Sequence, residues 1–453
     1  MTIPHVLAVP YPGQGHVIPM IELMQRLAQH GPKVTIVNAD FIHTRVMNAL
    51  PRNEDLGENL NLVSIPDGLE PWEDRNDILK VSVAMQRVMP KELEELIRKI
   101  DEGADENCYR YCVIANGTMG WAVDVAKRMG IKVGVVWFAS AATLASIHSI
   151  PRLIDDGILN KEDGSVAKSE LFQLSSTIPA ISSETLMWTS FNDAAIRKNC
   201  FQLLSNCNQS MKLADLIICN SAYELEAAAF SAIPNVLPVG PLSATSMPRN
   251  KAGNFWSVDS SCLSWLDQQP VCSVIFVAFG SFTVFDQIQF QELALGLELT
   301  NKPFLWVVRP DITTDTQVVY PDGFQDRVGS RGKLVGWAPQ EKVLSHPAVA
   351  CFLSHCGWNS TIEGVSNGVP FLCWPYFADQ LSNQAYICEI WKTGLGFERD
   401  EAGIIRQDEI VNKVKQLFNG NYGARALELQ SKVREDGSSK KNLSNFFDWV
   451  RVE

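Results

Sequence analysis

The chain has 453 residues, of which 46% are hydrophobic and 20% charged, and its formal net charge is −12. This length is too great for one ordinary core and predicts about two or three domains, and the composition is globular rather than disordered or fibrous. The acidic balance argues against broad binding to nucleic acid or to anionic membrane surfaces.

The N-terminal half alternates short apolar runs with amphipathic segments. A strand over residues 5–9 is followed by a Gly- and Pro-rich turn over 10–16 and by a helix over 18–30, whose apolar residues recur at helical spacing. The same alternation predicts further strands and helices at 33–37, 112–115, 121–129, 133–138 and 216–219. Such a pattern is typical of a parallel, doubly wound α/β sheet.

The apolar runs of the chain are short. The first residues lack the basic start and apolar core of a signal peptide. The longest later run, 134–145, is shorter than the roughly 20 residues that span a bilayer. We therefore expect a cytoplasmic protein without stable membrane insertion, and we expect it to be a monomer.

The pattern restarts in the C-terminal half. Residues 240–256 have no apolar period and are interpreted as a linker. Strands and helices are predicted after it, at 273–279, 286–299, 304–309 and 333–335. Two similar halves predict two facing domains, residues 1–239 and 257–435, with ligands in the cleft at the carboxyl ends of the strands. Residues 436–453 form an amphipathic tail helix that must bury its apolar face.

The most specific motif of the chain spans residues 337–380 and reads WAPQEKVLSHPAVACFLSHCGWNSTIEGVSNGVPFLCWPYFADQ. It resembles, without a gap, the donor-binding signature of the plant secondary-product UDP-glycosyltransferases, family 1 of the GT-B fold. The resemblance extends over the whole chain, including the PGQGH turn that ends at His16 and the FGS turn at 279–281. It implies two Rossmann-like domains facing a cleft, with the tail helix packed back on the N-terminal domain, and an inverting enzyme that uses a UDP-sugar as co-substrate.

The resemblance assigns a set of residues to the UDP-sugar donor. They are Ser281, Trp337, Ala338, Gln340, His355, Gly357, Trp358, Asn359, Ser360, Glu363, Asp379 and Gln380. Within the set, His355, Asn359 and Ser360 are expected to contact the phosphates, with Ser281 beside them. Gly357 allows close backbone approach, and the helix predicted over 359–366 presents free N–H groups and a positive dipole end, so a pyrophosphate fits without a metal.

The remaining donor residues are assigned to the nucleoside and the sugar. The resemblance implies that Trp337 stacks on uracil, that the backbone of Ala338 bonds to it, and that Glu363 holds the ribose hydroxyls. His355 and Cys356 are adjacent and cannot readily share a tetrahedral metal ion, so no metal site is predicted.

Trp358, Asp379 and Gln380 are expected to contact the sugar. In the family a glutamine at the last of these positions usually accompanies glucose donors. The predicted donor is therefore UDP-glucose, with xylose, rhamnose and glucuronate as open alternatives.

His16 is the candidate catalytic base. It lies between the first strand and the first helix, and a helix N-terminus disfavours the imidazolium and keeps the ring neutral, as a base requires. The resemblance implies that His16 deprotonates the acceptor hydroxyl, whose oxygen attacks the anomeric carbon opposite UDP and inverts it.

The partner of this histidine departs from the family pattern. The family has an aspartate just after a strand that reads CVIAD, whereas this chain has Asn116 after Cys112-Val113-Ile114-Ala115. Asparagine can orient the ring but brings no charge. Three interpretations follow: an acidic acceptor, such as a phenol or a carboxylic acid, needs little help; the residue is a natural or engineered change that slows turnover; or Asp124 substitutes.

The acceptor pocket is expected in the N-terminal half and to be apolar, as suits a phenol, flavonoid, terpenoid or hormone. Candidate lining residues are Met85, Met119, Trp121, Phe138, Ile147, Met187 and Phe191. A rival hypothesis is a non-catalytic UDP-sugar-binding protein in which Asn116 marks lost chemistry. A dinucleotide oxidoreductase and a hydrolase are disfavoured because the chain lacks the motifs G-x-G-x-x-G and G-x-S-x-G.

Overall fold

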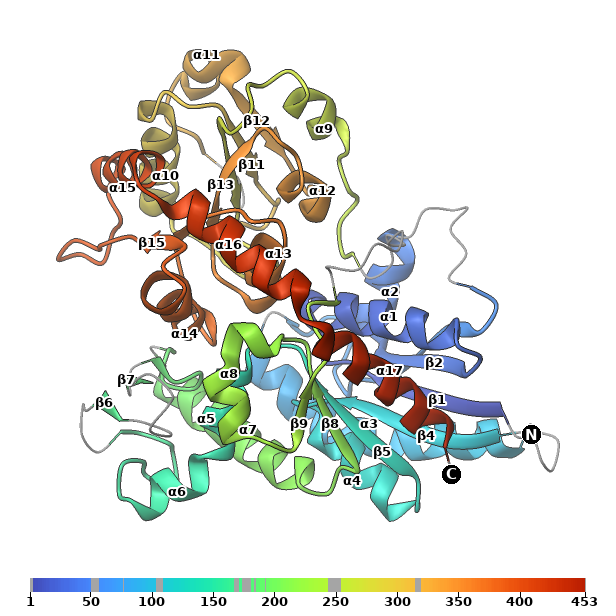
Figure 1. Ribbon diagram of the computed structural model, residues 1–453. Coiled ribbons are helices and arrows are strands. Elements are labelled where there is room, and N and C mark those ends of the chain that lie inside the picture. The colour runs from blue at the N-terminus through green and yellow to red at the C-terminus, as the bar shows by residue number, and fades with distance from the viewer. Residues whose placement is uncertain are drawn as a thin grey trace. The chain divides into compact units, whose positions relative to one another are not determined.

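The computed structural model describes residues 3–49, 57–75, 77–102, 109–166, 171–172, 181–182, 185–191, 193–242, 254–313 and 319–452. The chain divides into two compact units, of which the first combines residues 1–255 with 436–453 and the second is residues 256–435. Each unit is built on its own parallel sheet (Figure 1). Most of the predicted linker, residues 243–253, lies outside the described residues.

The sheet of the first unit has seven parallel strands in the order β3-β2-β1-β4-β5-β8-β9. The strands are β1 (Ile3–Val9), β2 (Lys33–Ala39), β3 (Leu60–Ile65), β4 (Tyr109–Asn116), β5 (Lys132–Trp137), β8 (Leu216–Cys219) and β9 (Val236–Pro238). A separate antiparallel pair is formed by β6 (Leu171–Phe172) and β7 (Ile181–Ser182). Strands of a parallel sheet are covered on both faces, which explains why β1 reads as an almost continuous apolar run.

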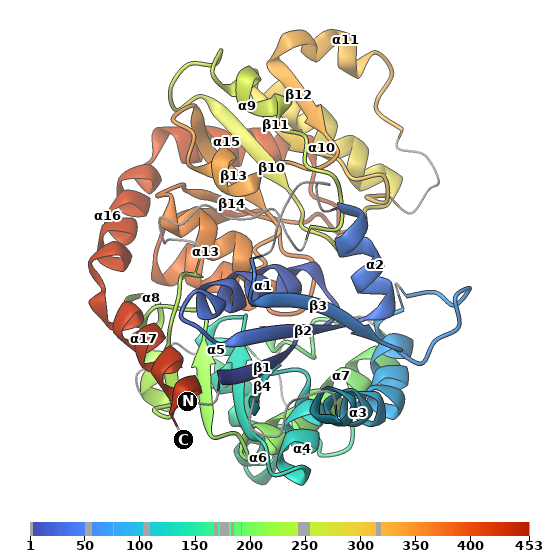
Figure 2. The ribbon, with the colours of Figure 1, turned by 90° about the vertical axis from the view of Figure 1, so that its right-hand side faces the viewer.

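Helices cover both faces of this sheet. Figure 2 shows α1 above the sheet and α3, α4 and α7 below it. The helices of the unit are α1 (Gln14–Ala28), α2 (Asp40–Ala49), α3 (Ile78–Glu102), α4 (Gly120–Arg128), α5 (Ala141–His148), α6 (Ile150–Asp155), α7 (Ala194–Met211), α8 (Tyr223–Ala232) and α17 (Gly437–Arg451). Among the described residues, no helix is both long enough and apolar enough to cross a membrane.

The C-terminal helix α17 is part of the first unit. Its residues Phe446, Phe447 and Val450 are buried in the same hydrophobic cluster as residues of β1 and α1. Polar contacts fix it to the sheet, because Asn442 Nδ2 donates to the carbonyl oxygen of Pro238 in β9 at 2.9 Å. The amphipathic pattern of the tail is thus explained by burial of one face in this core.

The sheet of the second unit has six parallel strands in the order β12-β11-β10-β13-β14-β15. The strands are β10 (Val274–Ala278), β11 (Phe304–Val307), β12 (Gly332–Val335), β13 (Val349–Ser354), β14 (Phe371–Cys373) and β15 (Gly394–Gly396). Its helices are α9 (Ser261–Leu266), α10 (Gln287–Leu299), α11 (Phe324–Val328), η3 (Gly329–Arg331), α12 (Gln340–Leu344), α13 (Trp358–Ser366), α14 (Gln380–Ala385), η4 (Tyr386–Ile390), α15 (Gln407–Asn419) and α16 (Tyr422–Glu435). Two all-parallel sheets with helices confirm the predicted α/β fold class.

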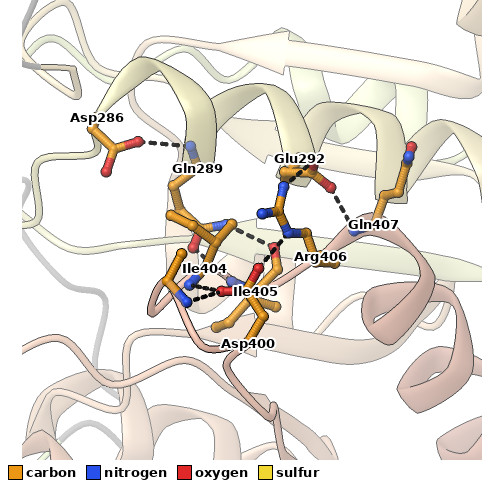
Figure 3. A network of polar contacts seen from close by, with 9 residues as sticks. Asp286, Gln289, Glu292, Asp400, Ile404, Ile405, Arg406 and Gln407 are labelled. Carbon is orange, nitrogen blue, oxygen red and sulfur yellow. Dashed lines mark hydrogen bonds and ion pairs between the residues drawn. The ribbon is translucent and has the colours of Figure 1, made fainter.

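A polar network joins α10 to the segment before α15 (Figure 3). Asp286 caps α10 by accepting from the amide of Gln289 at 2.7 Å. The Gln289 side chain then pairs with the backbone of Ile405 through two hydrogen bonds of 2.9 Å. Arg406 reaches Glu292 of the same helix at 3.2 Å. These bonds hold a buried backbone segment that lies 116 residues further along the chain.

Each sheet has one point where its strand order reverses, and the candidate catalytic residues and part of the donor candidates lie there. In the first sheet this point separates β1 from β4, and Val9 pairs with Ala115 at the ends of these strands. In the second sheet it separates β10 from β13, where Ala278 pairs with Ser354. Ligands of open α/β sheets bind beyond the carboxyl ends of the strands at such switch points.

Candidate functional sites

His16 lies in the first turn of α1 rather than in the turn before it. The expected helix start at residue 18 is wrong, because α1 already begins at Gln14 with Gly13 as its N-cap. The amides of His16 and Val17 both donate to the Gly13 carbonyl oxygen at 2.9 Å. The imidazole therefore has a fixed position at the helix N-terminus, beyond the end of β1.

Asn116 is the hydrogen-bond partner of His16. It ends β4, the strand beside β1, and its Nδ2 lies 3.1 Å from His16 Nδ1. The interpretation that Asp124 substitutes is not supported, because Asp124 on α4 accepts a hydrogen bond of 3.0 Å from Ser210 on α7. The structure thus brings the two predicted catalytic residues together, 100 positions apart in the sequence.

An aromatic ring packs against His16. The Tyr11 ring meets the imidazole edge-on, with 5.1 Å between the ring centroids. Burial lowers the pKa of His16 from 6.5 to about 4, because desolvation disfavours the imidazolium. At neutral pH the ring is therefore uncharged.

The predicted donor residues lie around the first turns of α13. This helix begins at Trp358 directly after the turn that follows β13, and its N-cap, Gly357, has no side chain to accept from the first amides. Cys356 just before it has a positive φ of 63°. The N-terminus of a helix of this length concentrates N–H donors and the positive end of the helix dipole, which attract an anion.

His355 lies between two glycine turns. A Cβ on Gly280, after β10, or on Gly357, after β13, would come within 2.5 Å of His355 Nε2. Gly280 also has a φ of +62°, which favours glycine. Burial, and next the charge of Arg309, lowers the pKa of His355 to about 4, so this ring is neutral at pH 7.

Arg309 fixes the turn after β10 by hydrogen bonds to its backbone carbonyl groups. Its guanidinium is 1% exposed, donates to the carbonyl oxygens of Gly280 and Thr283, and pairs with Asp311 at 3.1 Å. Three partners satisfy this buried charge, as a buried guanidinium requires. Ser281, which follows Gly280, is partly exposed.

Gln340, Ser360 and Glu363 form one hydrogen-bonded group. Gln340 Nε2, at the start of α12, donates to Ser360 Oγ at 3.0 Å and to Glu363 Oε2 at 2.9 Å. Ser360 and Glu363 lie one turn apart on α13. Their hydroxyl and carboxylate are therefore held at a common position beside the helix N-terminus.

Trp337 stacks on Trp256, with 4.8 Å between the ring centroids and 28° between the planes. The guanidinium of Arg309 lies 5.6 Å from the centroid of the Trp256 ring. Ala338, next to Trp337, is buried. The partly exposed indole of Trp337 therefore packs against a second aromatic ring, and that second ring lies next to a cation.

Asp379 and Gln380 start α14 and are tied to the turn before α13. Asn383 Nδ2 donates to Asp379 Oδ2 and to the Cys356 carbonyl oxygen, both at 2.9 Å. Burial raises the pKa of Asp379 to about 6, although the bond from Asn383 favours the ionised form. Gln380 Oε1 accepts from the amides of Tyr376 at 2.7 Å and Phe377 at 3.1 Å, so its Nε2 is the group that can donate to a ligand.

Two further donor candidates begin α13. Trp358 is 3% exposed and packs near Trp391, with 6.5 Å between the ring centroids. Asn359 is partly exposed. All twelve predicted donor residues thus belong to the second unit, on the turns and helix starts that follow β10, β12, β13 and β14.

The seven acceptor candidates separate into two groups. Met85, Met119, Phe138 and Ile147 are at most 3% exposed, and Phe138 belongs to the hydrophobic core cluster. Packing among helices and strands accounts for these four without a ligand. The other three are partly exposed and remain candidates: Trp121, Met187 and Phe191.

Four residues of these sites were missed from the sequence. They are Thr118, Trp256, Arg309 and Asn383. Only Thr118 carried a local signal, since an asparagine two positions earlier favours a side-chain turn. The other three contact residues that are distant in sequence: Trp256 contacts Trp337, Arg309 contacts Gly280, and Asn383 contacts Cys356. Asn383 also bonds to Asp379, one turn earlier at the start of α14. Within the described ranges, no group of three or more His, Cys, Asp or Glu residues could hold a metal ion.

Comparison with known proteins gives a consistent set of relatives. The family model described as "UDP-glucoronosyl and UDP-glucosyl transferase" matches residues 4–450. UDP-glycosyltransferase 83A1 of Arabidopsis thaliana is 43% identical over 99% of this chain and 97% of its own. Linamarin synthase 1 of Manihot esculenta is 35% identical over 99% and 97%. A solved UDP-glucosyltransferase from Polygonum tinctorium, capable of glucosylating indoxyl, is 28% identical with a TM-score of 0.82 over 100% of both chains.

Proposed function

The chain belongs to the UDP-glycosyltransferase family and has the GT-B architecture of its solved relatives, and from this premise we propose that it is an inverting glucosyltransferase. As a member it is a hexosyltransferase that uses a UDP-sugar and acts on small acceptors. The proposal adds that the sugar is glucose, that the acceptor is lipophilic, and that the transfer is to an oxygen atom next to His16. The observation that carries it is the grouping of the donor residues around the first turns of α13.

The diphosphate of UDP is proposed to bind at the N-terminus of α13. The first amides of the helix, neutral His355, and the hydroxyls of Ser360 and Ser281 supply donors, and the helix dipole supplies positive potential. The same groups stabilise the charge that develops on UDP as it leaves, which is electrostatic stabilisation by a preorganised site.

The nucleoside and the sugar are proposed to bind on either side of this helix end. Trp337, stiffened by Trp256, stacks on uracil, and Glu363, held by Gln340, accepts from the ribose hydroxyls. Asp379 accepts from glucose hydroxyls, while Gln380 donates to them through Nε2. The sugar hydroxyls would then meet one hydrogen-bond acceptor, the Asp379 carboxylate, and one donor, Gln380 Nε2.

His16 is proposed to be the residue at the acceptor oxygen, as general base where the acceptor is a hydroxyl. Its low pKa keeps it neutral at pH 7, the form that a base requires. Asn116 brings no negative charge to stabilise the imidazolium that would form, so we expect slower turnover than an aspartate would support.

The acceptor is proposed to be a small apolar molecule such as a phenol, flavonoid, terpenoid or hormone. The relatives' names support this class, because they include a linamarin synthase, a 7-deoxyloganetin glucosyltransferase and an indoxyl-glucosylating enzyme. The partly exposed Trp121, Met187 and Phe191 are the residues proposed to line its pocket.

The proposal is tested by measuring UDP release from UDP-glucose with a panel of phenolic, carboxylic and aliphatic acceptors. We expect turnover with at least one acceptor, and we expect His16→Gln to lower kcat at least about tenfold, because it removes the imidazole that is positioned at the acceptor oxygen. The Kd for UDP should stay unchanged. His30→Gln, at an exposed histidine just beyond α1, is the matched control and should retain full activity.

A non-catalytic UDP-sugar-binding protein is the alternative, and the absence of an aspartate at position 116 favours it. Binding of UDP-glucose without UDP release for any acceptor, in this chain and in Asn116→Asp, would establish that alternative.

A further inference from the structure

The amide of Asn116 has only one orientation that its surroundings allow. Its Oδ1 accepts from the backbone amide of Thr118 at 3.0 Å and from Thr118 Oγ1 at 2.6 Å. A backbone N–H can only donate, so the atom that faces it must be the oxygen of the amide. Asn116 is 1% exposed and Thr118 8%, so water has little access to compete for these bonds.

This orientation turns the NH₂ group of Asn116 toward His16. The distance from Nδ2 to His16 Nδ1 is 3.1 Å, and Nδ2 is a donor only. His16 Nδ1 must therefore accept, which requires its lone pair. The neutral imidazole then carries its single proton on Nε2.

An aspartate at the same position would reverse this pattern. One of its oxygens could serve Thr118 while the other accepted a proton from Nδ1–H, leaving the Nε2 lone pair available as a base. In a serine protease triad the same change from aspartate to asparagine keeps the geometry, imposes the wrong tautomer and lowers kcat about 10⁴-fold. His16 in this chain is in the corresponding state.

We propose that Thr118, acting through Asn116, holds His16 as the Nε2–H tautomer, and that the chain consequently glucosylates acceptors that arrive as oxygen anions, carboxylates foremost, rather than neutral hydroxyls. The inference rests on the function proposed above. His16 then acts as a hydrogen-bond donor that orients the anion. Thr118 is a positioning residue, because it acts through Asn116.

The reaction of a carboxylate balances without a base. A carboxylate oxygen forms the new bond to the anomeric carbon, the bond from that carbon to the UDP oxygen breaks, and the electron pair leaves with UDP. No proton has to be moved. A neutral hydroxyl must lose a proton. Nε2 of His16 can accept that proton only if the ring carries its own proton on Nδ1 instead. The Nδ1–H donor would then face the NH₂ donor of Asn116, which is unfavourable.

The tautomer is measured directly by ¹⁵N-edited NMR of the full-length protein labelled at histidine, with UDP bound. The His16 signals are assigned by their loss in His16→Gln. We expect a protonated Nε2 and an unprotonated Nδ1 in this chain, and a protonated Nδ1 in Asn116→Asp. Thr118→Ser should leave the signals as they are, and Thr118→Val should broaden or shift them because one of the two bonds to Oδ1 is lost. A protonated Nδ1 in the unchanged chain would overturn the proposal.

The acceptor class is measured as kcat/KM for matched pairs, such as benzoate and benzyl alcohol, with an acidic phenol as a further arm. We expect this chain to favour benzoate, and we expect Asn116→Asp to raise the rate with benzyl alcohol about 10²-fold or more while changing that with benzoate less than about threefold. A preference for the phenol over benzoate would assign the anion to a phenolate.

Two results contradict the inference in different ways. Equal rates with benzyl alcohol in this chain and in Asn116→Asp would overturn it while the proposed transferase function stands. No transfer by either form, with UDP-glucose still bound, would overturn the proposed function itself.

Discussion

At the scale of single residues, the environment of a side chain decides its chemistry more than its identity does. His16 and His355 are both neutral because burial lowers the pKa of each to about 4. Asp379 has the opposite shift, to about 6, for the same reason, since burial disfavours whichever form is charged. The result is a donor region whose histidine and carboxyl group both titrate below neutral pH.

Asp379 should make UDP-glucose binding sensitive to pH. In the proposed site its ionised form accepts from sugar hydroxyls, so affinity should be complete well above pH 6 and should fall as the pH drops through about 6. Loss of hydrogen bonds to a charged group costs about 1.5–3 kcal/mol. Calorimetric Kd values for UDP-glucose should therefore rise at acid pH.

The matched variant is Asp379→Asn, which keeps an oxygen for Asn383 but does not titrate. Its affinity should be weaker at neutral pH and independent of pH between about 7 and 5. If the Kd for UDP-glucose rises equally at acid pH in the two proteins, Asp379 has no role at the sugar. UDP-glucose is the better probe than UDP, because the terminal phosphate of UDP itself titrates near pH 6.

At the scale of elements, the donor site depends on close approach of the turns after β10 and β13. The His355 ring fills the space between them, so neither Gly280 nor Gly357 has room for a Cβ. Gly357 has an ordinary φ of −61°, so any residue could adopt its backbone conformation. Contact with His355, rather than backbone strain, therefore selects glycine there.

Gly357→Ala should displace His355 and weaken UDP binding by about tenfold or more, because an added Cβ would lie 2.5 Å from Nε2. Calorimetry with UDP measures this effect, and urea unfolding reports any loss of stability. Gly423→Ala in α16 is the control, since a Cβ there meets no atom within 4 Å. UDP affinity equal in the two variants would show that the ring can move without consequence.

At the scale of the whole molecule, histidines that are shielded from water make folding sensitive to acid. Burial lowers the pKa values of His5, His16 and His148 in the first unit, and of His355 in the second, from 6.5 to about 4. Between these pH values the unfolded chain binds more protons than the folded chain, so the free energy of unfolding falls as the pH drops. The raised pKa of Asp379 has the opposite effect and offsets His355 in the second unit.

The first unit should therefore lose stability earlier on acidification. Amide hydrogen exchange, corrected for the intrinsic pH dependence, should show protection falling in β1, β4 and β5 before β10 and β13 as the pH drops from about 6.5 to 4. His5 is 1% exposed, and His5→Gln should reduce the slope of stability against pH by up to about 1.4 kcal/mol per pH unit. Equal acid sensitivity of the two sheets would contradict this account.

Residues 337–380 indicated the family and predicted the donor residues from the sequence alone, because they form a contiguous segment in which strand, turn and helix follow each other at fixed spacing. The alternation of apolar runs and amphipathic segments along the chain indicated the α/β class. Periodicity likewise located most strands of the two parallel sheets to within a few residues, but only a minority of the helices. Local spacing did not predict the start of α1 correctly. Backbone hydrogen bonds to the Gly13 carbonyl oxygen extend the helix back to Gln14, and His16 therefore lies in its first turn.

The partners of these residues follow from tertiary packing and not from the sequence. Three contacts join segments that are far apart in the chain: the hydrogen bond between Asn116 and His16, the stack of Trp256 on Trp337, and the contact of His355 with the turn at Gly280. Burial is also a tertiary property, and it sets the pKa of His16 and separates the core residue Phe138 from the partly exposed Trp121. The physical reason is the same in each case: contacts between distant segments leave no spacing in the sequence from which they could be inferred.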